Sequence, residues 1–160
     1  MKNTSTFARM FKGGTGILIV ALLGLGLIML NRNPLQLQAQ SGFALHRISA
    51  SGYELQSTIT IYNPNILSST IENLHEEFRL NGELVSIIKQ QPMQGIPGRK
   101  ETSFPVSIRF DEEAFARIVA ADSLFDGNTL NLNVTGEITY HNFTGGGSIV
   151  VDFDETVPLN

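Results

Sequence analysis

Residues 53–65, with the sequence YELQSTITIYNPN, decide the fold. The odd-numbered residues at the start of this run are mainly apolar and the even-numbered residues mainly polar, which is the period of a strand with one buried face. Asn63-Pro64-Asn65 then ends the strand, because proline donates no ladder hydrogen bond and asparagine side chains bond their own backbone in turns. We therefore expect a central core strand whose buried face carries Tyr53, Leu55, Ser57, Ile59 and Ile61.

Length and composition indicate one folded domain behind an apolar N-terminal segment. The chain has 160 residues, 42% of them hydrophobic and 16% charged, close to the average of globular proteins. It contains no cysteine, so disulfides, thiolate metal sites and a cysteine nucleophile are excluded. Residues 1–32 hold four basic and no acidic residues, and the remainder holds seven basic and 15 acidic residues, a net charge of −8. We expect so acidic a domain to be repelled by nucleic acids and by anionic lipid surfaces.

Residues 13–30, GGTGILIVALLGLGLIML, form an uncharged run of 18 residues. As a helix the run would be about 27 Å long, close to the roughly 30 Å of a bilayer core. It predicts a single N-terminal transmembrane helix over residues 13–31, a signal anchor in contact with membrane lipid. Lys2, Arg9 and Lys12 precede the run and Arg32 alone follows it. The positive-inside rule then places the basic residues 1–12 in the cytoplasm and the domain outside the inner (plasma) membrane, in a periplasmic or other extracytoplasmic space.

A cleavable signal peptide is the alternative interpretation of the same segment, because a basic start and an apolar core are typical of both. Cleavage would release a secreted or periplasmic domain. The best cleavage position lies after Ala39, where Leu37 occupies a position that should hold a small residue. The apolar run has also ended nine residues earlier, so the sequence favours an uncleaved anchor.

The rest of the chain predicts about seven strands and one helix, mostly joined by hairpins, and so an antiparallel β-sandwich. Asn81-Gly82 has the residues that a two-residue type I′ hairpin turn requires. Pro105 confines its strand to a sheet edge, or to a position at which the missing N–H would have faced solvent. The expected strands are 35–45, 53–65, 71–80, 83–89, 104–110, 129–140 and 148–157, with turns at 51–52, 94–98 and 142–147.

The single helix is expected after the strand that contains Pro105. Asp111 can cap its N-terminus, and Gly127 can end it. Its predicted buried stripe consists of Phe115, Ile118 and Val119.

The first strand, 35–45, begins directly after the apolar segment. Its alternation places Gln36, Gln38 and Gln40 on the outward face, and the change of parity at Ile48 predicts a bulge near His46 and Arg47.

The ordered set of these features resembles the late embryogenesis abundant (LEA) type 2 family, also known by the water stress and hypersensitive response domain, including its small membrane-anchored bacterial members. The likeness covers about residues 35–158. It implies an immunoglobulin-like sandwich with one helix and a non-catalytic role linked to desiccation or other stress. The residues that carry the resemblance are Ile59, Ile61, Asn63, Pro64, Asn65, Leu80, Asn81, Gly82, Gly95, Ile96, Pro97, Phe104, Val106, Ile108, Val134, Gly136 and Tyr140.

The three histidines and the C-terminal acidic cluster do not form a recognisable metal site. The histidines are far apart in the sequence and have no partner at metal-ligand spacing. The acidic cluster lacks the glycine turn and the remaining ligands of a calcium loop. We expect solvated strand residues at all six positions, which are His46, His75, His141, Asp152, Asp154 and Glu155.

The remaining candidates for chemistry also favour structural roles. Glu76-Glu77 and Glu112-Glu113 are adjacent pairs, which point to different sides of a strand or serve a helix start, so neither predicts an acid/base pair. Gly145-Gly146-Gly147-Ser148 lacks the lysine of a phosphate loop, and Asn142-Phe143-Thr144 matches a glycan acceptor pattern. We predict no catalytic residue, no cofactor and no metal, and hence no enzyme.

Three functions follow from the predicted anchor and the family resemblance. The leading one is a membrane-tethered extracytoplasmic module that protects the cell in desiccation, osmotic or envelope stress. The second is an accessory subunit of a membrane or envelope complex, with a protein partner at the sheet edge near Pro105. The third is a module that binds a lipid or another apolar ligand between the sheets. The oligomeric state is left open.

Overall fold

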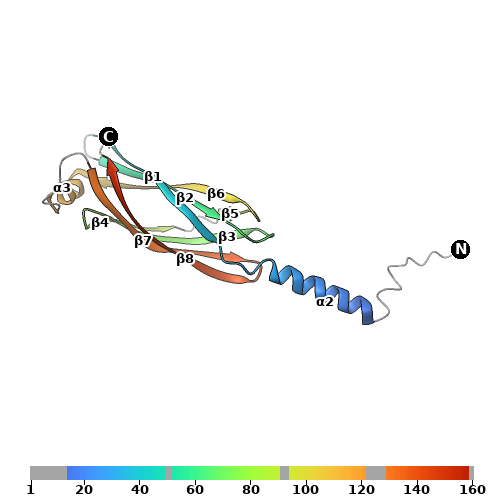
Figure 1. Ribbon diagram of the computed structural model, residues 1–160. Coiled ribbons are helices and arrows are strands. Elements are labelled where there is room, and N and C mark those ends of the chain that lie inside the picture. The colour runs from blue at the N-terminus through green and yellow to red at the C-terminus, as the bar shows by residue number, and fades with distance from the viewer. Residues whose placement is uncertain (1–13, 50–51, 91–93, 122–128, 159–160) are drawn as a thin grey trace.

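The computed structural model describes residues 14–49, 52–90, 94–121 and 129–158 (Figure 1). Its helices are α2 (Gly14–Met29) and α3 (Glu112–Ala121). Its strands are β1 (Gln36–Ser49), β2 (Gly52–Tyr62), β3 (Ser69–Leu80), β4 (Glu83–Gln90), β5 (Gln94–Ile96), β6 (Glu101–Asp111), β7 (Thr129–Asn142) and β8 (Gly145–Pro158). The predicted mainly β fold is confirmed.

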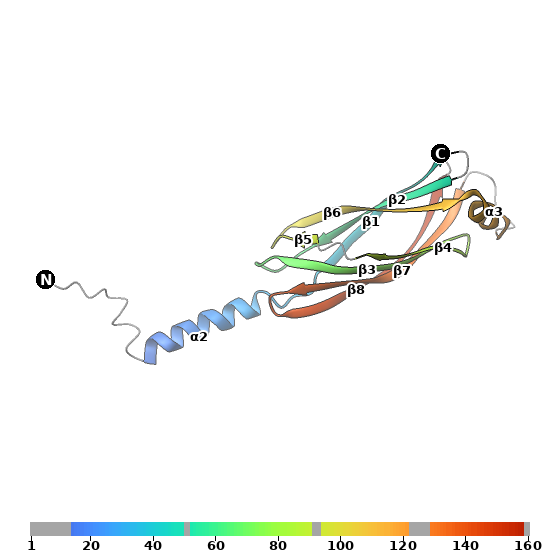
Figure 2. The same cartoon turned by 180° about the vertical axis from the view of Figure 1, so that it is seen from behind.

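The strands form two antiparallel sheets that lie one above the other (Figures 1 and 2). The smaller sheet has the order β1-β2-β6. The larger sheet has the order β4-β3-β7-β8, and β5 pairs with β3. α2 projects from one end of the two layers, and α3 lies at the opposite end (Figure 2). The immunoglobulin-like topology stays a prediction.

The YELQSTITIYNPN run supplies most of β2, the central strand of the smaller sheet. β2 pairs with β1 on one side and with β6 on the other. Ile59 and Ile61 have no exposed surface, Leu55 and Ser57 are buried, and Tyr53 is half-buried. The predicted buried face is therefore confirmed.

One cluster of buried apolar side chains joins the two sheets and α3. Burial of apolar surface is the main favourable term in folding, so this shared core is what holds the layers together. The fully buried members with the largest side chains are Phe78, Leu45, Leu55, Ile59, Ile61, Ile71, Leu74, Leu80, Ile96, Ile118, Leu130 and Leu132.

β6 is the edge strand that Pro105 predicted. It pairs with β2 alone, and Pro105 stands opposite Thr58. The strand alternates cleanly between buried and exposed residues, with Pro105 exposed. Proline is tolerated here because the outer side of an edge strand needs no ladder donor.

The β3–β4 hairpin turns at Asn81 and Gly82, as expected. Both residues have positive φ, 49° and 80°, which a type I′ turn requires at its two central positions. The Asn81 side chain also accepts a hydrogen bond from the Asn131 backbone N–H (2.8 Å), and the Asn81 N–H donates to the Asn131 carbonyl (2.7 Å). The turn is thereby fastened to the neighbouring strand β7.

α3 begins at its predicted cap. The Asp111 carboxylate accepts the Ala114 backbone N–H at 2.8 Å, the bond expected of an N-cap residue. Ile118 is fully buried, while Phe115 and Val119 are half-buried. Gly127, the predicted end of the helix, lies outside the described residues.

The prediction of a turn over residues 94–98 is wrong in its first half. Gln94, Gly95 and Ile96 form β5, which pairs with the start of β3, so the described residues contain eight strands rather than seven. Ile96 has no exposed surface. The gain from burying this side chain outweighs the turn propensity of its neighbours, and the chain turns only after it.

The outward position predicted for Gln40 is also wrong. β1 shifts its register against β2 between Leu37 and Ala39 and again between Ser41 and Ala44. Each shift inserts residues without a partner and changes which side chains face inward. Gln40 is 3% exposed as a result. A third shift, between Arg47 and Ser49, adjoins the bulge predicted near His46 and Arg47.

The turn predicted over residues 142–147 is present but shorter than expected. β7 continues to Asn142 and β8 begins at Gly145, with Tyr140 paired to Gly147. A Cβ at Gly147 would lie 2.5 Å from the Tyr140 hydroxyl, so the glycine leaves room for the tyrosine ring. Gly147 can therefore belong to the strand beside Tyr140, where a larger residue would clash.

No helix within the described ranges combines the length and the apolar content that crossing a membrane requires.

We predict that Gly136→Ala destabilises the fold by about 1–3 kcal/mol, the usual range for overpacking. Gly136 pairs with Glu76, and a Cβ there would overlap the His75 carbonyl oxygen and lie 2.8 Å from the Glu76 Cα. Urea unfolding of the full-length chain in mild detergent, followed by circular dichroism, measures the change.

The matched control is Gly95→Ala, because an added Cβ at Gly95 meets no atom within 4 Å. Its free energy of unfolding should stay within about 0.5 kcal/mol of the parent. Equal effects of the two substitutions would contradict the account given for Gly136.

Candidate functional site

The first candidate region is the junction at which α2 enters the domain. Asn31 is fully buried. Its side chain donates to the Leu27 carbonyl (2.7 Å), which satisfies one of the free carbonyls at the end of α2, and accepts the Leu67 N–H (2.7 Å). The Asn31 carbonyl accepts the Thr144 hydroxyl at 3.2 Å. One residue thus joins α2 to the β2–β3 loop and to the β7–β8 turn.

The β2–β3 loop is organised by Asn63, which has no exposed surface. Its amide donates to the carbonyls of Leu67 (3.0 Å) and Ile96 (2.9 Å), and its side-chain oxygen accepts the Asn65 N–H (3.0 Å). These bonds replace the ladder partners that the backbone loses where β2 stops. Asn63 therefore supplies partners for backbone groups where the chain turns beside the core.

Asn65 connects the same loop to the segment that follows α2. Its side-chain oxygen accepts the Asn33 N–H (3.0 Å), and its amide donates to the Asn33 carbonyl (2.9 Å). The Arg99 N–H donates to the carbonyls of Asn63 (2.8 Å) and Asn65 (2.9 Å). We call Asn31, Asn33, Asn63, Asn65 and Thr144 together the helix junction. Its hydrogen bonds fix the direction in which α2 leaves the domain.

The second region is a buried polar cluster between the sheets. The Gln40 amide donates weakly to the Ser57 hydroxyl (3.3 Å) and to the Glu76 carboxylate (3.4 Å). Gln40 and Ser57 come from the smaller sheet and Glu76 from the larger one. In the described structure, Oε1 of Gln40 and Oε1 of Glu76 have no hydrogen-bond partner. The cluster is therefore short of donors.

Glu76 has no exposed surface, and burial raises the pKa of its carboxyl to about 7, against the opposing effect of the Gln40 hydrogen bond. A carboxylate removed from water is destabilised relative to its neutral form. Protonation also supplies a donor to a cluster in which acceptors are in excess. Glu76 consequently changes its charge near neutral pH inside the core.

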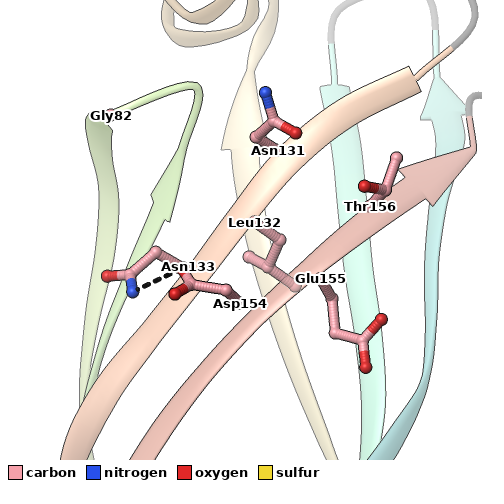
Figure 3. A pocket seen from close by; sticks show the side chains of 7 residues that line it. All are labelled: Gly82, Asn131, Leu132, Asn133, Asp154, Glu155 and Thr156. Atoms are coloured by element: carbon pink, nitrogen blue, oxygen red, sulfur yellow. Dashed lines mark hydrogen bonds between the residues drawn. The ribbon is translucent and has the colours of Figure 1, made fainter.

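The third region is an open hollow of about 650 Å³ at the end of the domain away from α2. Figure 3 shows its lining, which comes from β7, β8 and the turn at Gly82. Asn133 donates to Asp154 at 3.0 Å, while Glu155 points away from that pair (Figure 3). Asp152 pairs with Thr135 farther along β8 and does not line the hollow. The acidic residues at 152, 154 and 155 are therefore not brought together.

The histidines and the glutamate pairs are also dispersed. His46 lies in β1, His75 in β3 and His141 in β7. Among the described residues, no three histidine, aspartate or glutamate side chains form a group that could hold a metal ion.

The members of each predicted glutamate pair have separate environments. Glu76 is buried, whereas Glu77 is half-buried and bonds Arg79. Glu112 pairs with Arg47, and Glu113 pairs with Arg117.

The family model LEA_2, late embryogenesis abundant protein, matches residues 58–157, which is more than half of the chain. The chain belongs to the LEA_2 family. The resemblance in the sequence is thereby confirmed at the level of the family, while a small membrane-anchored bacterial member stays a prediction. A comparison with curated proteins gave no match.

Two solved structures share the fold of this LEA_2 chain. A protein from Archaeoglobus fulgidus is 12% identical with a TM-score of 0.59, and the alignment covers 78% of this chain and 98% of that one. The Northeast Structural Genomics Consortium target SoR45 is 14% identical with a TM-score of 0.52, over 76% of this chain and 85% of that one. At these identities the likeness concerns the fold alone.

The predicted motif residues of the LEA_2 domain are spread over the structure rather than gathered in one site. Some lie in the core and some at the helix junction, and one stands beside the buried polar cluster. Ile59 and Ile61 are core residues, and Asn63, Pro64 and Asn65 form the loop at the helix junction. Asn81 and Gly82 form the distal hairpin turn. Gly95 and Pro97 flank the Ile96 carbonyl that Asn63 binds, and Gly136 pairs with Glu76.

Sequence reasoning missed four residues that matter in these regions. Asn31 and Asn33 lie at the border of the predicted anchor and carry no pattern of their own. Gln40 is buried by a register shift. Glu76 had a usable signal, because it shares the parity of Leu74, Phe78 and Leu80 and so belongs to the buried face of its strand.

We predict that Asn63→Ala lowers the free energy of unfolding by about 3–5 kcal/mol, because two buried carbonyls and one N–H lose their partner and each such loss costs about 1–3 kcal/mol. Urea unfolding of the full-length chain measures the loss. Asn73→Ala is the control, since Asn73 is exposed and bonds only the Thr139 hydroxyl among its described contacts. A loss below about 1 kcal/mol for Asn63→Ala would refute the role assigned to Asn63.

We predict that the contribution of Glu76 to the free energy of unfolding falls by about 3 kcal/mol as the pH rises from about 4.5 to above 7. The pKa of Glu76 is about 7 in the folded chain against an ordinary value of 4.5, so the folded state binds more protons throughout this interval. The full stabilisation exists below the unfolded pKa and is lost as the pH rises through the folded one.

The difference between the parent and Glu76→Gln isolates this contribution from all other titrating groups. Unfolding free energies at pH 5, 6, 7 and 8 should diverge in favour of Glu76→Gln as the pH increases. Glu77→Gln is the control and should keep the slope of the parent, because Glu77 lies outside the buried cluster. Parallel pH profiles for the parent and Glu76→Gln would show that Glu76 is not the group responsible.

Proposed function

We propose that this LEA_2 chain is a non-catalytic module, held at the inner membrane by its N-terminal apolar segment, that protects the cell in desiccation, osmotic or envelope stress. Membership of the family supports a non-catalytic β module with a stress-related or ligand-binding role. The helix α2 supports the tether. The outside location of the domain rests on the three basic residues that precede the apolar segment.

The observation that carries this proposal is the apolar, uncovered surface of α2. Its side chains from Ile17 onward are apolar on every side of the helix, and nearly all are exposed, with Ile17 and Leu23 at 70%. A helix that is hydrophobic all round is typical of a core or a membrane, and nothing in the described chain covers this one. A bilayer would remove that surface from water at about 25 cal/mol per Å².

The first strand supports an uncleaved anchor over a cleaved signal peptide. Leu35 is buried, and β1 begins at Gln36, which pairs with Tyr62. Cleavage after Ala39 would remove Leu35 and the first residues of β1 together with Asn31 and Asn33, and with them the hydrogen bonds that Asn31 and Asn33 make in the helix junction. These contacts favour retention of the segment that leads into α2.

An accessory subunit of an envelope complex is the second candidate. The outer side of β6 is unpaired within the described residues, so a partner strand could extend the smaller sheet there. Pro105 lies in the middle of that edge, and its missing N–H limits how many bonds such a partner could form. This feature ranks the subunit below the free-standing module.

A ligand held between the sheets has less support. Ile59 of the smaller sheet and Phe78 of the larger one belong to a single buried cluster and are at most 1% exposed.

The tether predicts that the full-length chain sediments with membranes and resists extraction at alkaline pH. A version that lacks residues 13–30 should remain in the supernatant. In spheroplasts, added protease should digest the domain of the full-length chain. Extraction of the full-length chain with alkali would reject the anchor, and protection of the domain would reject the proposed orientation.

The protective role predicts poorer survival of a deletion strain on drying and at high osmolarity, with rescue by the full-length gene. The version without residues 13–30 should rescue less well, because it is not retained at the membrane. Equal survival of the deletion strain and its parent would remove the stress role and leave the tether standing.

A further inference from the structure

Three chain segments meet at the end of the domain from which α2 projects (Figure 2). The β2–β3 loop and the β7–β8 turn each bond Asn31 directly, through Leu67 and Thr144. The β5–β6 segment joins them through Arg99, which bonds the carbonyls of Asn63 and Asn65. If α2 lies in a bilayer, these loops are the part of the domain nearest to the membrane surface.

Two large apolar side chains are exposed on these loops. Phe143 is 54% exposed at the tip of the β7–β8 turn, next to Thr144. Ile66 is 41% exposed in the β2–β3 loop, next to Leu67. Each therefore lies one residue from a hydrogen bond to the end of α2. Leu30, 48% exposed, directly precedes Asn31 in the chain.

The same end of the domain is basic, although the domain as a whole is acidic. Arg32, Arg99 and Lys100 are exposed, and none has an ion pair within the described residues. Glu101 is their nearest acidic neighbour in the sequence.

The other arginines of the domain are neutralised by ion pairs. Their carboxylate partners lie 2.9–3.6 Å away in the pairs Arg47–Glu112, Arg79–Glu77, Arg109–Glu54 and Arg117–Glu83. The unpaired basic side chains around the helix junction therefore carry a local positive charge that the net charge conceals.

We infer that this end of the domain is a lipid-contacting surface, in which Phe143 and Ile66 enter the interfacial layer of the bilayer while Arg32, Arg99 and Lys100 contact anionic headgroups. The inference rests on the proposed anchor. Apolar and aromatic side chains beside basic ones suit the membrane interface. Basic residues at the surface are attracted to anionic lipid. The expected repulsion of the domain by anionic membranes then applies to its distal surfaces only.

The surface would fix the domain relative to the membrane at several points. The helix junction sets the direction of α2 against the loops, and the loops then contact the same bilayer that holds α2. The open hollow near Asp154 and the acidic face around it would be held away from the lipid.

The absence of tryptophan from the chain allows a direct test. Phe143→Trp places a single fluorophore in the proposed surface. Leu22→Trp reports on the anchor, and Leu84→Trp, at an exposed position of β4 near the distal turn, is the matched control. The full-length variants are reconstituted into phosphatidylcholine vesicles, with or without phosphatidylglycerol, and quenched by lipids with brominated acyl chains.

We expect brominated lipid to quench Phe143→Trp and Leu22→Trp and to leave Leu84→Trp unquenched. Emission of Phe143→Trp should shift to shorter wavelength, and its quenching should increase with phosphatidylglycerol. Adding Arg99→Asn and Lys100→Gln should weaken that increase, because only Arg32 of the three basic side chains then remains. Asparagine is chosen because it tolerates the positive φ of position 99 (54°).

Each outcome decides between the anchor and the surface. Quenching of Leu22→Trp without quenching of Phe143→Trp would overturn the lipid-contacting surface and leave the anchor intact. Loss of quenching in both would remove the anchor and the inference with it. Equal quenching of Phe143→Trp and Leu84→Trp would show that the domain contacts lipid without a preferred end, which would overturn the proposed surface. An unchanged dependence on phosphatidylglycerol in the Arg99→Asn, Lys100→Gln variant would overturn the role of the basic residues.

Discussion

The structure depends on asparagine side chains that take over the hydrogen bonds of a backbone leaving its sheet. At the end of β2 the chain must turn beside the core, where every N–H and C=O needs a partner. Asn63 supplies three such bonds and Asn65 two more to Asn33. The same two residues give their carbonyls to Arg99. Five bonds from two short side chains thus hold together the loops of both sheets and the segment that leads to α2.

The core contains a carboxyl group that a packing argument alone would not place there. Glu76 stands between Leu74 and Phe78 on the buried face of β3, within reach of the Gln40 amide. Gly136 opposite it has no side chain, and this absence leaves room for the strand backbone at that point. A single donor across 3.4 Å does not offset the loss of hydration, so the carboxyl is neutral over much of the acidic range. The free energy of unfolding therefore depends on pH through the ionisation of Glu76 in the core.

The sequence predictions that succeeded concern features set by residues close together in the chain. Asn81-Gly82, Asp111 and Pro105 each act through their own backbone geometry or through near neighbours, so a turn, a cap and an edge strand could be assigned before the partner elements were known. The features that were not predicted depend on how strands far apart in the sequence pair with one another. Gln40 points inward because of bulges that form only against β2, and β5 exists because Ile96 finds a place beside β3. Glu76 is the exception, because its parity was readable and only its charge argued against burial.

The unpaired edge of β6 becomes a possible site of self-association when water is scarce. As a cell dries its proteins are forced together, and an unpaired strand is a template on which like strands assemble into fibrils. Pro105 interrupts the row of donors halfway along this strand, and the neighbouring exposed positions carry serine and charged side chains. A second copy that extended the sheet at β6 would therefore form fewer hydrogen bonds there than a regular strand pair. Edge-to-edge assembly through β6 is therefore disfavoured even where drying brings copies of the chain together.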